Sequence, residues 1–240
     1  MYQEQIASNS FDAVLQAAQV GAGTRLLDVA CGSGMALQRA AARGAECTGV
    51  DASAELLAIA RDRVPSAELL HCDMSAMPLP DASFDVVTSF NGIQFGARDA
   101  VHECARVLRR GGLFALVFWE DPGDFGRYFA AVGSVAPAPA PGAPSPMALR
   151  EPGVAEALVQ EAGLTVLSRG STEVVGLYRD TDDAYRGLAS SGPAWSAIEH
   201  AGEDALHTAL APVIDSFSDP VTGRVRVAGT FGHVIASSGD

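Results

Sequence analysis

Short apolar runs alternate with helically patterned stretches through the first half of the chain. The runs have the length of strands, and they cover residues 25–30, 46–50, 68–70, 84–90 and 113–119. Between them, apolar residues recur at helical spacing over residues 35–43, 54–63 and 98–109. This repeated order predicts a parallel sheet with right-handed crossovers and helices on both faces. Such sheets bind ligands at the carboxyl ends of their strands, so the residues after each run are the functional candidates.

The composition of the chain limits its fold and its binding partners. The chain has 240 residues, 48% of them hydrophobic, enough for the core of one α/β domain over residues 1–240. Its net charge of −13 has the wrong sign for neutralising phosphates, so we expect no nucleic-acid partner. All 16 basic residues are arginines. The lack of lysine excludes Schiff-base catalysis, a P-loop lysine and a Tyr/Lys dehydrogenase pair.

Cysteine spacing and hydropathy bear on metals and on location. The four cysteines form no close pair at metal-ligand spacing, so we expect reduced core residues and no metal site. The N-terminus lacks the charged and apolar regions of a secretory leader, and no apolar run reaches membrane-spanning length. We therefore expect a cytoplasmic protein that binds no membrane.

The first run leads into a turn that contains two glycines. Asp28 lies near the end of the run, and Ala30, Gly32 and Gly34 follow it at the start of the next helix. Glycines here let a ligand approach the backbone, and the helix N-terminus offers unpaired N–H groups to an anionic group. A tight turn would need glycine even without a ligand, so this motif indicates a site only together with others.

Asp51 stands 19 residues after Gly32, at the end of the second run. An acidic residue here can accept hydrogen bonds from both hydroxyls of a ribose. Asp51 or Ser53 could also cap the following helix, and a capping Ser53 is compatible with a ribose role for Asp51. A nicotinamide dinucleotide would fit both motifs, but its fingerprint needs a third glycine where Leu37 stands. Leu37 therefore disfavours a dinucleotide site.

Two further segments make the pattern specific. His71-Cys72-Asp73-Met74 follows the third run, and Leu-Arg-Arg-Gly-Gly at 108–112 leads into the fifth. With these four motifs in order, residues 24–120 resemble the class I S-adenosylmethionine-dependent methyltransferases, in particular the group similar to ubiquinone-biosynthesis and small-molecule enzymes. The resemblance implies an α/β fold with a doubly wound, mostly parallel, seven-stranded Rossmann-like sheet, an antiparallel last strand and a small helical cap. It also implies S-adenosylmethionine as the cofactor.

In this family each motif has a role. The resemblance implies that Asp28 orients the glycine turn and holds the cofactor's amino group directly or through water, that Asp51 binds the ribose and that Asp73 binds the adenine amino group. The other implied cofactor contacts are Ala30, Gly32, Gly34, Ala52, Met74, Phe90 and Asn91. Ala30 replaces the family's commonest glycine, which fits if its φ is negative. Relatives often have an N-terminal helix that closes over the cofactor, and the segment before Thr24 is short for one.

The methyl acceptor should lie beyond the transferred methyl, away from the buried adenosine. We expect it between the ends of the fourth and fifth runs and the segment 125–147, in contact with Gln94, Phe95, Trp119 and Tyr128. The catalytic residue is unknown, because a base is needed only if the acceptor arrives protonated. Glu120, and after it His233, are candidates for such a base.

The second half of the chain has a different composition. We divide the domain into a cofactor-binding half, 1–122, and an acceptor-side half, 123–240. Prolines make the segment 136–146 extended, as a solvated linker or a lid over the acceptor. A helix over 151–162, a strand over 164–178, cap helices over about 181–216 and a last strand over 224–235 complete the predicted fold.

The sequence thus favours methyl transfer to a small organic acceptor, such as a specialised metabolite. Two alternatives stay open, because a fold does not fix its chemistry. The first is an enzyme that binds S-adenosylmethionine but catalyses another reaction on the same scaffold. The second is a nucleotide-binding protein without turnover. The acceptor, the methylated atom and the oligomeric state are not determined by the sequence.

Overall fold

The computed structural model describes residues 2–95, 97–139, 145 and 147–239. Its strands are β1 (Arg25–Val29), β2 (Glu46–Asp51), β3 (Glu68–His71), β4 (Phe84–Phe90), β5 (Leu108–Asp121), β6 (Leu164–Tyr178) and β7 (Val225–Ser238). Its helices are α1 (Tyr2–Ala17), α2 (Met35–Ala41), α3 (Ala54–Arg63), α4 (Ala97–Val107), α5 (Asp124–Gly133), α6 (Val154–Glu161), α7 (Thr181–Ala189), α8 (Gly192–Ala201) and α9 (Glu203–Asp215), with short 3-10 helices η1 (Ile93–Phe95) and η2 (Ala148–Arg150).

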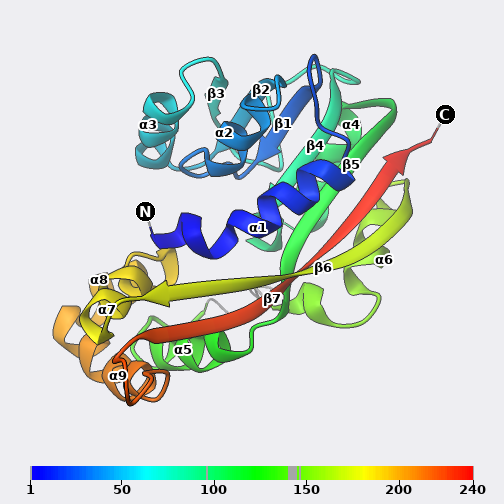
Figure 1. Cartoon of the computed structure of the whole chain (residues 1–240). Coiled ribbons are helices and arrows are strands. Elements are labelled where there is room, and N and C mark those ends of the chain that lie inside the picture. Colours follow the sequence, from blue (N-terminus) through cyan, green and yellow to red (C-terminus); the bar gives the residue numbers. More distant parts are fainter. Residues whose placement is uncertain (1, 96, 140–144, 146, 240) are drawn as a thin grey trace. The chain divides into compact units, whose positions relative to one another are not determined.

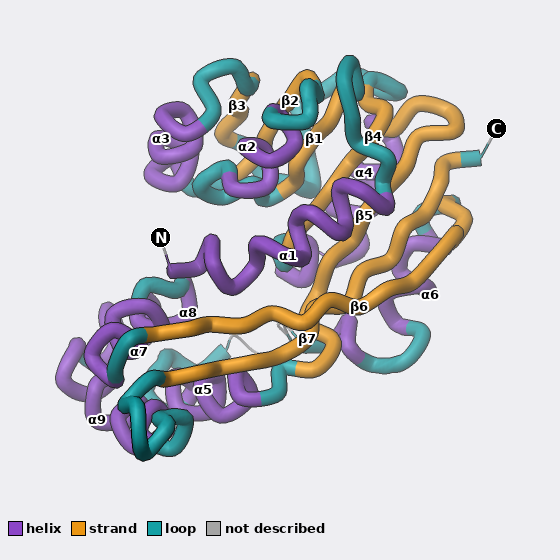
Figure 2. The backbone as a smooth tube through the Cα atoms, in the orientation of Figure 1, coloured by secondary structure: helices purple, strands orange, loops and turns teal. Residues whose placement is uncertain are grey.

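The strands form one seven-stranded sheet in the order β3-β2-β1-β4-β5-β7-β6 (Figures 1 and 2). The pairs from β3 to β5 are parallel, whereas β7 runs antiparallel to β5 and β6. The predicted doubly wound sheet with an antiparallel last strand is therefore confirmed. The chain leaves β1 toward β2 and β3 and then returns to β4 on the other side of β1. The carboxyl ends of β1 and β4 thus meet at a topological switch point, where open α/β sheets bind ligands.

One expectation about element bounds was wrong. Helix α4 ends at Val107 and β5 begins at Leu108, whereas the sequence predicted helix to residue 109 and strand from 113. A bulge explains the difference. Phe84 pairs with Leu108 but Val86 pairs with Leu113, so residues 109–112 form an irregular part of β5 and not the end of a helix. The N-terminal segment, whose role the sequence left open, forms the 16-residue helix α1.

The chain forms two compact units. The larger comprises residues 11–120, 144–172 and 231–240, and it holds α2, α3, α4, α6, β1 to β4 and most of β5. The smaller comprises residues 1–10, 121–143 and 173–230, and it holds α5, α7, α8 and α9, the last three being the predicted cap helices. The long strands β6 and β7 contribute residues to both units.

The core of the larger unit lies where α4 and α6 pack on the sheet. Phe114, Leu116 and Phe118 point into it from alternate positions of β5, and Val101 and Cys104 reach it from α4; all five are 0% exposed. Burying a large apolar side chain stabilises a fold by about 1.5–3 kcal/mol. This packing fixes the strands whose carboxyl ends carry the candidate site.

Arg106 on α4 holds the segment between β3 and β4 against this helix through hydrogen bonds. Its guanidinium donates to the carbonyl oxygens of Met77 (3.0 Å) and Leu79 (2.7 Å) and to the carboxylates of Asp81 and Glu103. Glu103 also accepts from the backbone N–H of Met77 at 2.9 Å. The hydrogen bonds from Arg106 hold the pKa of Glu103 below its usual range. The segment after Asp73 is thereby held to the core helix.

Ala30 and Asn91 occupy left-handed backbone conformations directly after β1 and β4. Their φ angles are 58° and 57°, so the expectation of a negative φ at Ala30 was wrong. Asparagine tolerates this region, whereas alanine bears a cost of roughly 1–2 kcal/mol. A Cβ added at Gly92 would lie 2.3 Å from the Cβ of Ala30. Residue 92 therefore has to be glycine because residue 30 carries a methyl group.

This contact predicts strong coupling between positions 30 and 92. Gly92→Ala should destabilise the fold by about 1–3 kcal/mol through overpacking. In an Ala30→Gly background the same change should cost at least about 1 kcal/mol less, because the opposing methyl is gone. Urea unfolding of the two single variants and the double variant measures this coupling. Gly21→Ala is the control, since nothing lies within 4 Å of an added Cβ there; additive effects at 30 and 92 would contradict the account.

Candidate functional site

A cavity of about 550 Å³ opens at the carboxyl ends of β1, β2, β3 and β4. It lies entirely within the larger unit and has a volume in the usual range for small-molecule sites. Every residue predicted to contact a cofactor lines it, except Asp28 and Gly34. Its full lining is Ala30, Gly32, Val50, Asp51, Ala52, Leu56, Cys72, Asp73, Met74, Ser75, Phe90, Asn91 and Gly92. The sheet topology thus brings residues from four separate motifs into one cavity.

Asp51 holds two walls of this cavity together. One carboxylate oxygen accepts from the backbone N–H of Gly32 and the other from that of Ser53, each at 2.8 Å. Ser53 in turn caps α3, because its hydroxyl accepts from the N–H of Leu56 at 3.2 Å. A carboxylate oxygen has two lone pairs. Asp51 can therefore hold the backbone and still accept hydrogen bonds from a ligand in the cavity.

Asp73 forms the opposite polar wall, after β3. Both the N–H (2.8 Å) and the hydroxyl (2.6 Å) of Ser75 donate to its Oδ1 atom. These two bonds, that from the hydroxyl first, lower the pKa of Asp73. Ser75 engages only Oδ1, so Oδ2 can accept from a ligand, and the same lining contains the apolar Met74 and Leu56. This combination of a hydrogen-bond acceptor and apolar side chains suits an aromatic ring with a hydrogen-bond donor on its edge.

Phe90 and Asn91 close the cavity at the end of β4. The ring of Phe11 from α1 packs edge-on against Phe90, with the centroids 4.8 Å apart. Asp12, next along α1, pairs with Arg39 of α2 and with Arg43 in the turn after it. Among the described residues, no group lies within hydrogen-bonding reach of the buried Oδ1 atom of Asn91. Buried polar atoms are normally satisfied, so this oxygen is suited to a donor on a ligand.

Asp28 and Gly34 lie near the cavity but are not part of its lining. Asp28 is 2% exposed and accepts a hydrogen bond of 2.7 Å from the Thr88 hydroxyl. Gly34 begins α2 at a φ of 77°, and a Cβ there would meet the Cβ of Ala60 at 3.1 Å. Close helix packing and a left-handed turn therefore account for glycine at position 34.

The residues predicted to contact an acceptor are dispersed. Gln94 on η1 is 7% exposed, and its Oε1 atom has no hydrogen-bond partner among the described residues. Trp119 packs edge-on against Phe231 at 4.4 Å. Tyr128 is a core residue of the smaller unit: it is 2% exposed, and its hydroxyl bonds to Ser191 and to the Leu188 carbonyl. The side chain of Phe95 and most of the proline-rich segment, residues 140–144 and 146, lie outside what the structure describes.

Glu120 belongs to an ion-pair cluster. One of its oxygens accepts from Arg169 at 2.8 Å and the other from the hydroxyl of Ser171, while Arg169 also binds Glu156 at 2.6 Å. Burial raises the pKa of Glu120, but the bonds from Ser171 and Arg169 outweigh it and leave the pKa below its usual range. Both oxygens of Glu120 are thus occupied. Burial also lowers the pKa of the nearby His233, partly offset by the charge of Glu120.

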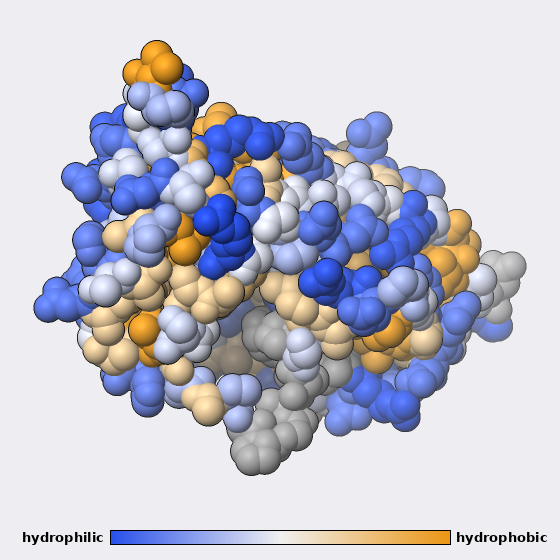
Figure 3. All heavy atoms as spheres, turned by 90° about the horizontal axis from the view of Figure 1, so that it is seen from below, coloured by the Kyte–Doolittle hydropathy of each residue, from blue (hydrophilic) through white to orange (hydrophobic). Residues whose placement is uncertain are grey.

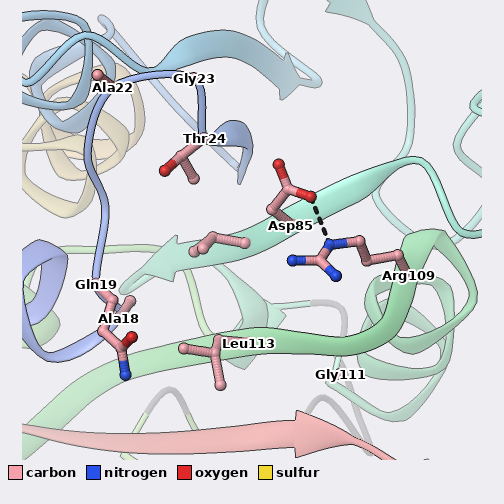
Figure 4. A pocket seen from close by; sticks show the side chains of 10 residues that line it. Ala18, Gln19, Ala22, Gly23, Thr24, Asp85, Arg109, Gly111 and Leu113 are labelled. Atoms are coloured by element: carbon pink, nitrogen blue, oxygen red, sulfur yellow. Dashed lines mark hydrogen bonds and ion pairs between the residues drawn. The ribbon is translucent and has the colours of Figure 1, made fainter. Parts of the chain in front are cut away.

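A second cavity, of about 310 Å³, lies at the amino end of β4 (Figure 4). Asp85 and Arg109 belong to its lining and point toward each other, and Arg109 donates to Asp85 at 2.5 Å. Asp85 also accepts from the backbone of Arg25 at 2.8 Å. None of the predicted cofactor residues lines this cavity. Its charged groups satisfy one another, as is typical of a structural ion pair.

Three further observations concern metals, thiols and membranes. Within the described part of the chain, no group of acidic, histidine or cysteine side chains could hold a metal ion. All four cysteines are free, and only Cys72 reaches the lining of the first cavity. In the same part of the chain, no helix combines the length and apolarity needed to cross a bilayer. On the face drawn in Figure 3, hydrophilic residues interrupt the apolar patches.

Sequence reasoning missed several residues of this site. Leu56, Ser75 and Gly92 line the cavity, and Phe11 supports its wall. Gly92 carried a usable signal, because it stands directly after the end of a buried strand. Leu56 and Phe11 lie inside helices, where nothing in their local pattern distinguishes a cavity wall from core.

Comparison with known proteins places this geometry in a family. A family model described as a methyltransferase domain matches residues 27–116. An uncharacterised protein of Mycobacterium tuberculosis is 32% identical over 203 residues, which cover 80% of this chain and 73% of that protein. A malonyl-acyl-carrier-protein O-methyltransferase of Enterobacter lignolyticus is 35% identical over 113 residues, 46% of this chain and 45% of that enzyme.

Solved structures agree in fold. A protein from Bacillus halodurans, described as a candidate methyltransferase, superposes with a TM-score of 0.67 at 17% identity, covering 97% of this chain and 100% of that one. The 4+2 cyclase SpnF gives 0.63 at 18% identity, covering 97% and 82%. A phosphoethanolamine N-methyltransferase from Haemonchus contortus, solved with S-adenosylhomocysteine, gives 0.60 at 17%, covering 97% and 53%. From the family model, these relatives and the fold together, the chain belongs to the class I S-adenosylmethionine-dependent methyltransferases.

Proposed function

We propose that this methyltransferase acts on a small organic acceptor, such as a specialised metabolite, and that the 550 Å³ cavity holds its cofactor. The observation that carries the proposal is the convergence of Asp51, Asp73, Phe90 and Asn91 on one cavity. These side chains come from three different strand ends. A net charge of −13 supports a small acceptor over a nucleic acid and fits a cytoplasmic enzyme.

The residues present fit S-adenosylmethionine. Asp51 has lone pairs left for both ribose hydroxyls after it has bound Gly32 and Ser53. Asp73 would accept from the adenine amino group, while Met74 and Leu56 would pack on the ring. The unpartnered Oδ1 atom of Asn91 would accept from the cofactor's ammonium group. When bound, the cofactor supplies an electrophilic methyl group on a sulfonium, so the protein's task is chiefly to position the acceptor and exclude water.

The acceptor would meet the methyl group near the end of β4. Gln94 is our proposed contact, because its buried Oε1 atom lacks a partner among the described residues and could accept from a hydroxyl or an amine. Glu120 is poorly suited as a general base. Ser171 and Arg169 occupy both of its oxygens and keep it ionised. A proton lost by the acceptor would therefore pass to solvent unless Glu120 is first released.

One observation favours a second candidate function. The fold also superposes on a 4+2 cyclase, so the scaffold is compatible with a reaction other than methyl transfer. In that case the chain would keep the cofactor cavity without transferring the methyl group. The two functions differ in the mass of the product.

The mass of the product distinguishes these functions. We expect incubation with methyl-deuterated S-adenosylmethionine and small-molecule extracts of the source organism to yield a labelled metabolite, with an equal amount of S-adenosylhomocysteine. Liquid chromatography with mass spectrometry reads both. The Asp51→Ala variant serves as the control and should give little of either product. A metabolite converted without label would support the cyclase-like function and contradict methyl transfer.

Loss of the Asp51 carboxylate should weaken cofactor binding. Asp51→Ala is expected to cost roughly 1–3 kcal/mol of binding free energy, or about 5- to 150-fold in Kd, because the ribose hydroxyls lose their acceptor. Calorimetric titration with S-adenosylhomocysteine measures the change. Asp62→Ala, at an exposed position of α3, is the matched control and should bind like the wild type. An unchanged Kd for Asp51→Ala would mean that the ribose lies elsewhere.

A further inference from the structure

Asp28 is a buried carboxyl group with few partners. It lies on β1 in the middle of the sheet, in register with Gly49 of β2 and Thr88 of β4. Gly49 offers no side chain, and a Cβ there would meet Leu37, Cys31 and Leu69 within 3 Å. Among the residues that the structure describes, Thr88 is the one whose side chain donates a hydrogen bond to Asp28, and it is itself 0% exposed. Thr88 is therefore the residue through which a substitution can change the hydrogen bonding of this buried carboxyl group.

Burial, the Thr88 hydroxyl and Asp51 together set the ionisation of Asp28. Burial raises its pKa, the hydrogen bond from Thr88 lowers it and the negative charge of Asp51 raises it again, for a result of about 7. The thiols of Cys31 and Cys47 also lie within electrostatic reach, and burial raises the pKa of both, so they are neutral near pH 7. A carboxyl group in this balance changes charge in the physiological range.

The Thr88 hydroxyl can serve both protonation states of Asp28. It donates to the ionised carboxylate at 2.7 Å, and the carbonyl oxygen of Leu27 lies 3.5 Å away as a second acceptor. If Asp28 is protonated, its O–H can donate to the Thr88 oxygen while the Thr88 hydrogen turns toward Leu27. The bond to the carboxylate is the stronger one, because it is charge-assisted. Thr88 therefore favours the ionised form.

We propose that Thr88 is a positioning residue that keeps Asp28 ready to ionise, so that binding of the cofactor's ammonium group is coupled to the loss of the Asp28 proton. This inference rests on the proposed function, which puts that ammonium group beside β1. Ala30, two residues after Asp28, lines the cavity, so Asp28 is close behind its wall. A nearby cation favours the charged form of a carboxyl group. The proton leaves the Asp28 carboxyl group for solvent, and the ammonium group keeps its own.

Calorimetry with S-adenosylhomocysteine from pH 6 to 9, in two buffers of different ionisation enthalpy, tests this coupling. We expect the wild type to release a proton on binding below pH 7, and its affinity to fall by up to about tenfold per pH unit there. Thr88→Val removes the hydrogen-bond donor to Asp28. As the pH is lowered, the affinity of this variant should therefore begin to fall at a higher pH than that of the wild type, and the two proteins should bind equally well at pH 9. Thr88→Ser restores the hydroxyl and should return the profile toward that of the wild type.

Two controls separate Thr88 from its surroundings. Thr48→Val makes the same change on neighbouring β2, where the residue is 8% exposed and pairs with Leu27, and should keep the wild-type profile. His71→Gln replaces a polar side chain at the end of β3, whose Nε2 atom lies 2.9 Å from the Ala52 carbonyl oxygen, and should also keep the wild-type profile.

Three results would overturn the inference. They are wild-type binding without proton release, a pH-independent loss of affinity in Thr88→Val, and a wild-type profile abolished by His71→Gln. If Thr88→Val does not fold, the proton release of the wild type and the pH profile of Thr88→Ser still test whether binding is coupled to the ionisation of Asp28. Failure to bind at any pH would instead refute the placement of the cofactor in this cavity.

Discussion

The site depends on the two hydrogen bonds that Asp51 accepts from Gly32 and Ser53. They tie the turn after β1 to the start of α3, and so hold two walls of the cavity at a fixed separation. The same carboxylate is our proposed ribose ligand. One partly exposed carboxylate would then organise the site and recognise the ligand, which reduces the reorganisation needed on binding. Ser53 extends this arrangement, because it caps α3 with its own hydroxyl.

Much of the fold and one side of the site could be predicted because they depend on local patterns. Strand ends are visible as the ends of apolar runs, and parallel topology guarantees that such ends share an edge of the sheet. Asp51, Asp73 and Asn91 could therefore be grouped from the sequence. The left-handed conformation of Ala30 could not, because it depends on how the turn packs on Gly92.

Other features could not be predicted because their partners lie far away in sequence. Glu120 stands at a strand end, as a functional residue should, but Arg169 and Ser171 lie 49 and 51 residues later and occupy both of its oxygens. Tyr128 looked like an aromatic pocket residue, yet its hydroxyl bonds to the Leu188 carbonyl, 60 residues on, in the core of the smaller unit. No spacing rule reveals such pairs.

The central claim is that the cavity at the ends of β1 to β4 holds the cofactor. A crystal structure of the chain with S-adenosylhomocysteine tests it most directly. We expect the ribose against Asp51, the adenine between Asp73 and Leu56, and the amino group near Asn91 and Asp28. Density for the ligand between Asp85 and Arg109, or anywhere away from Asp51, would contradict it.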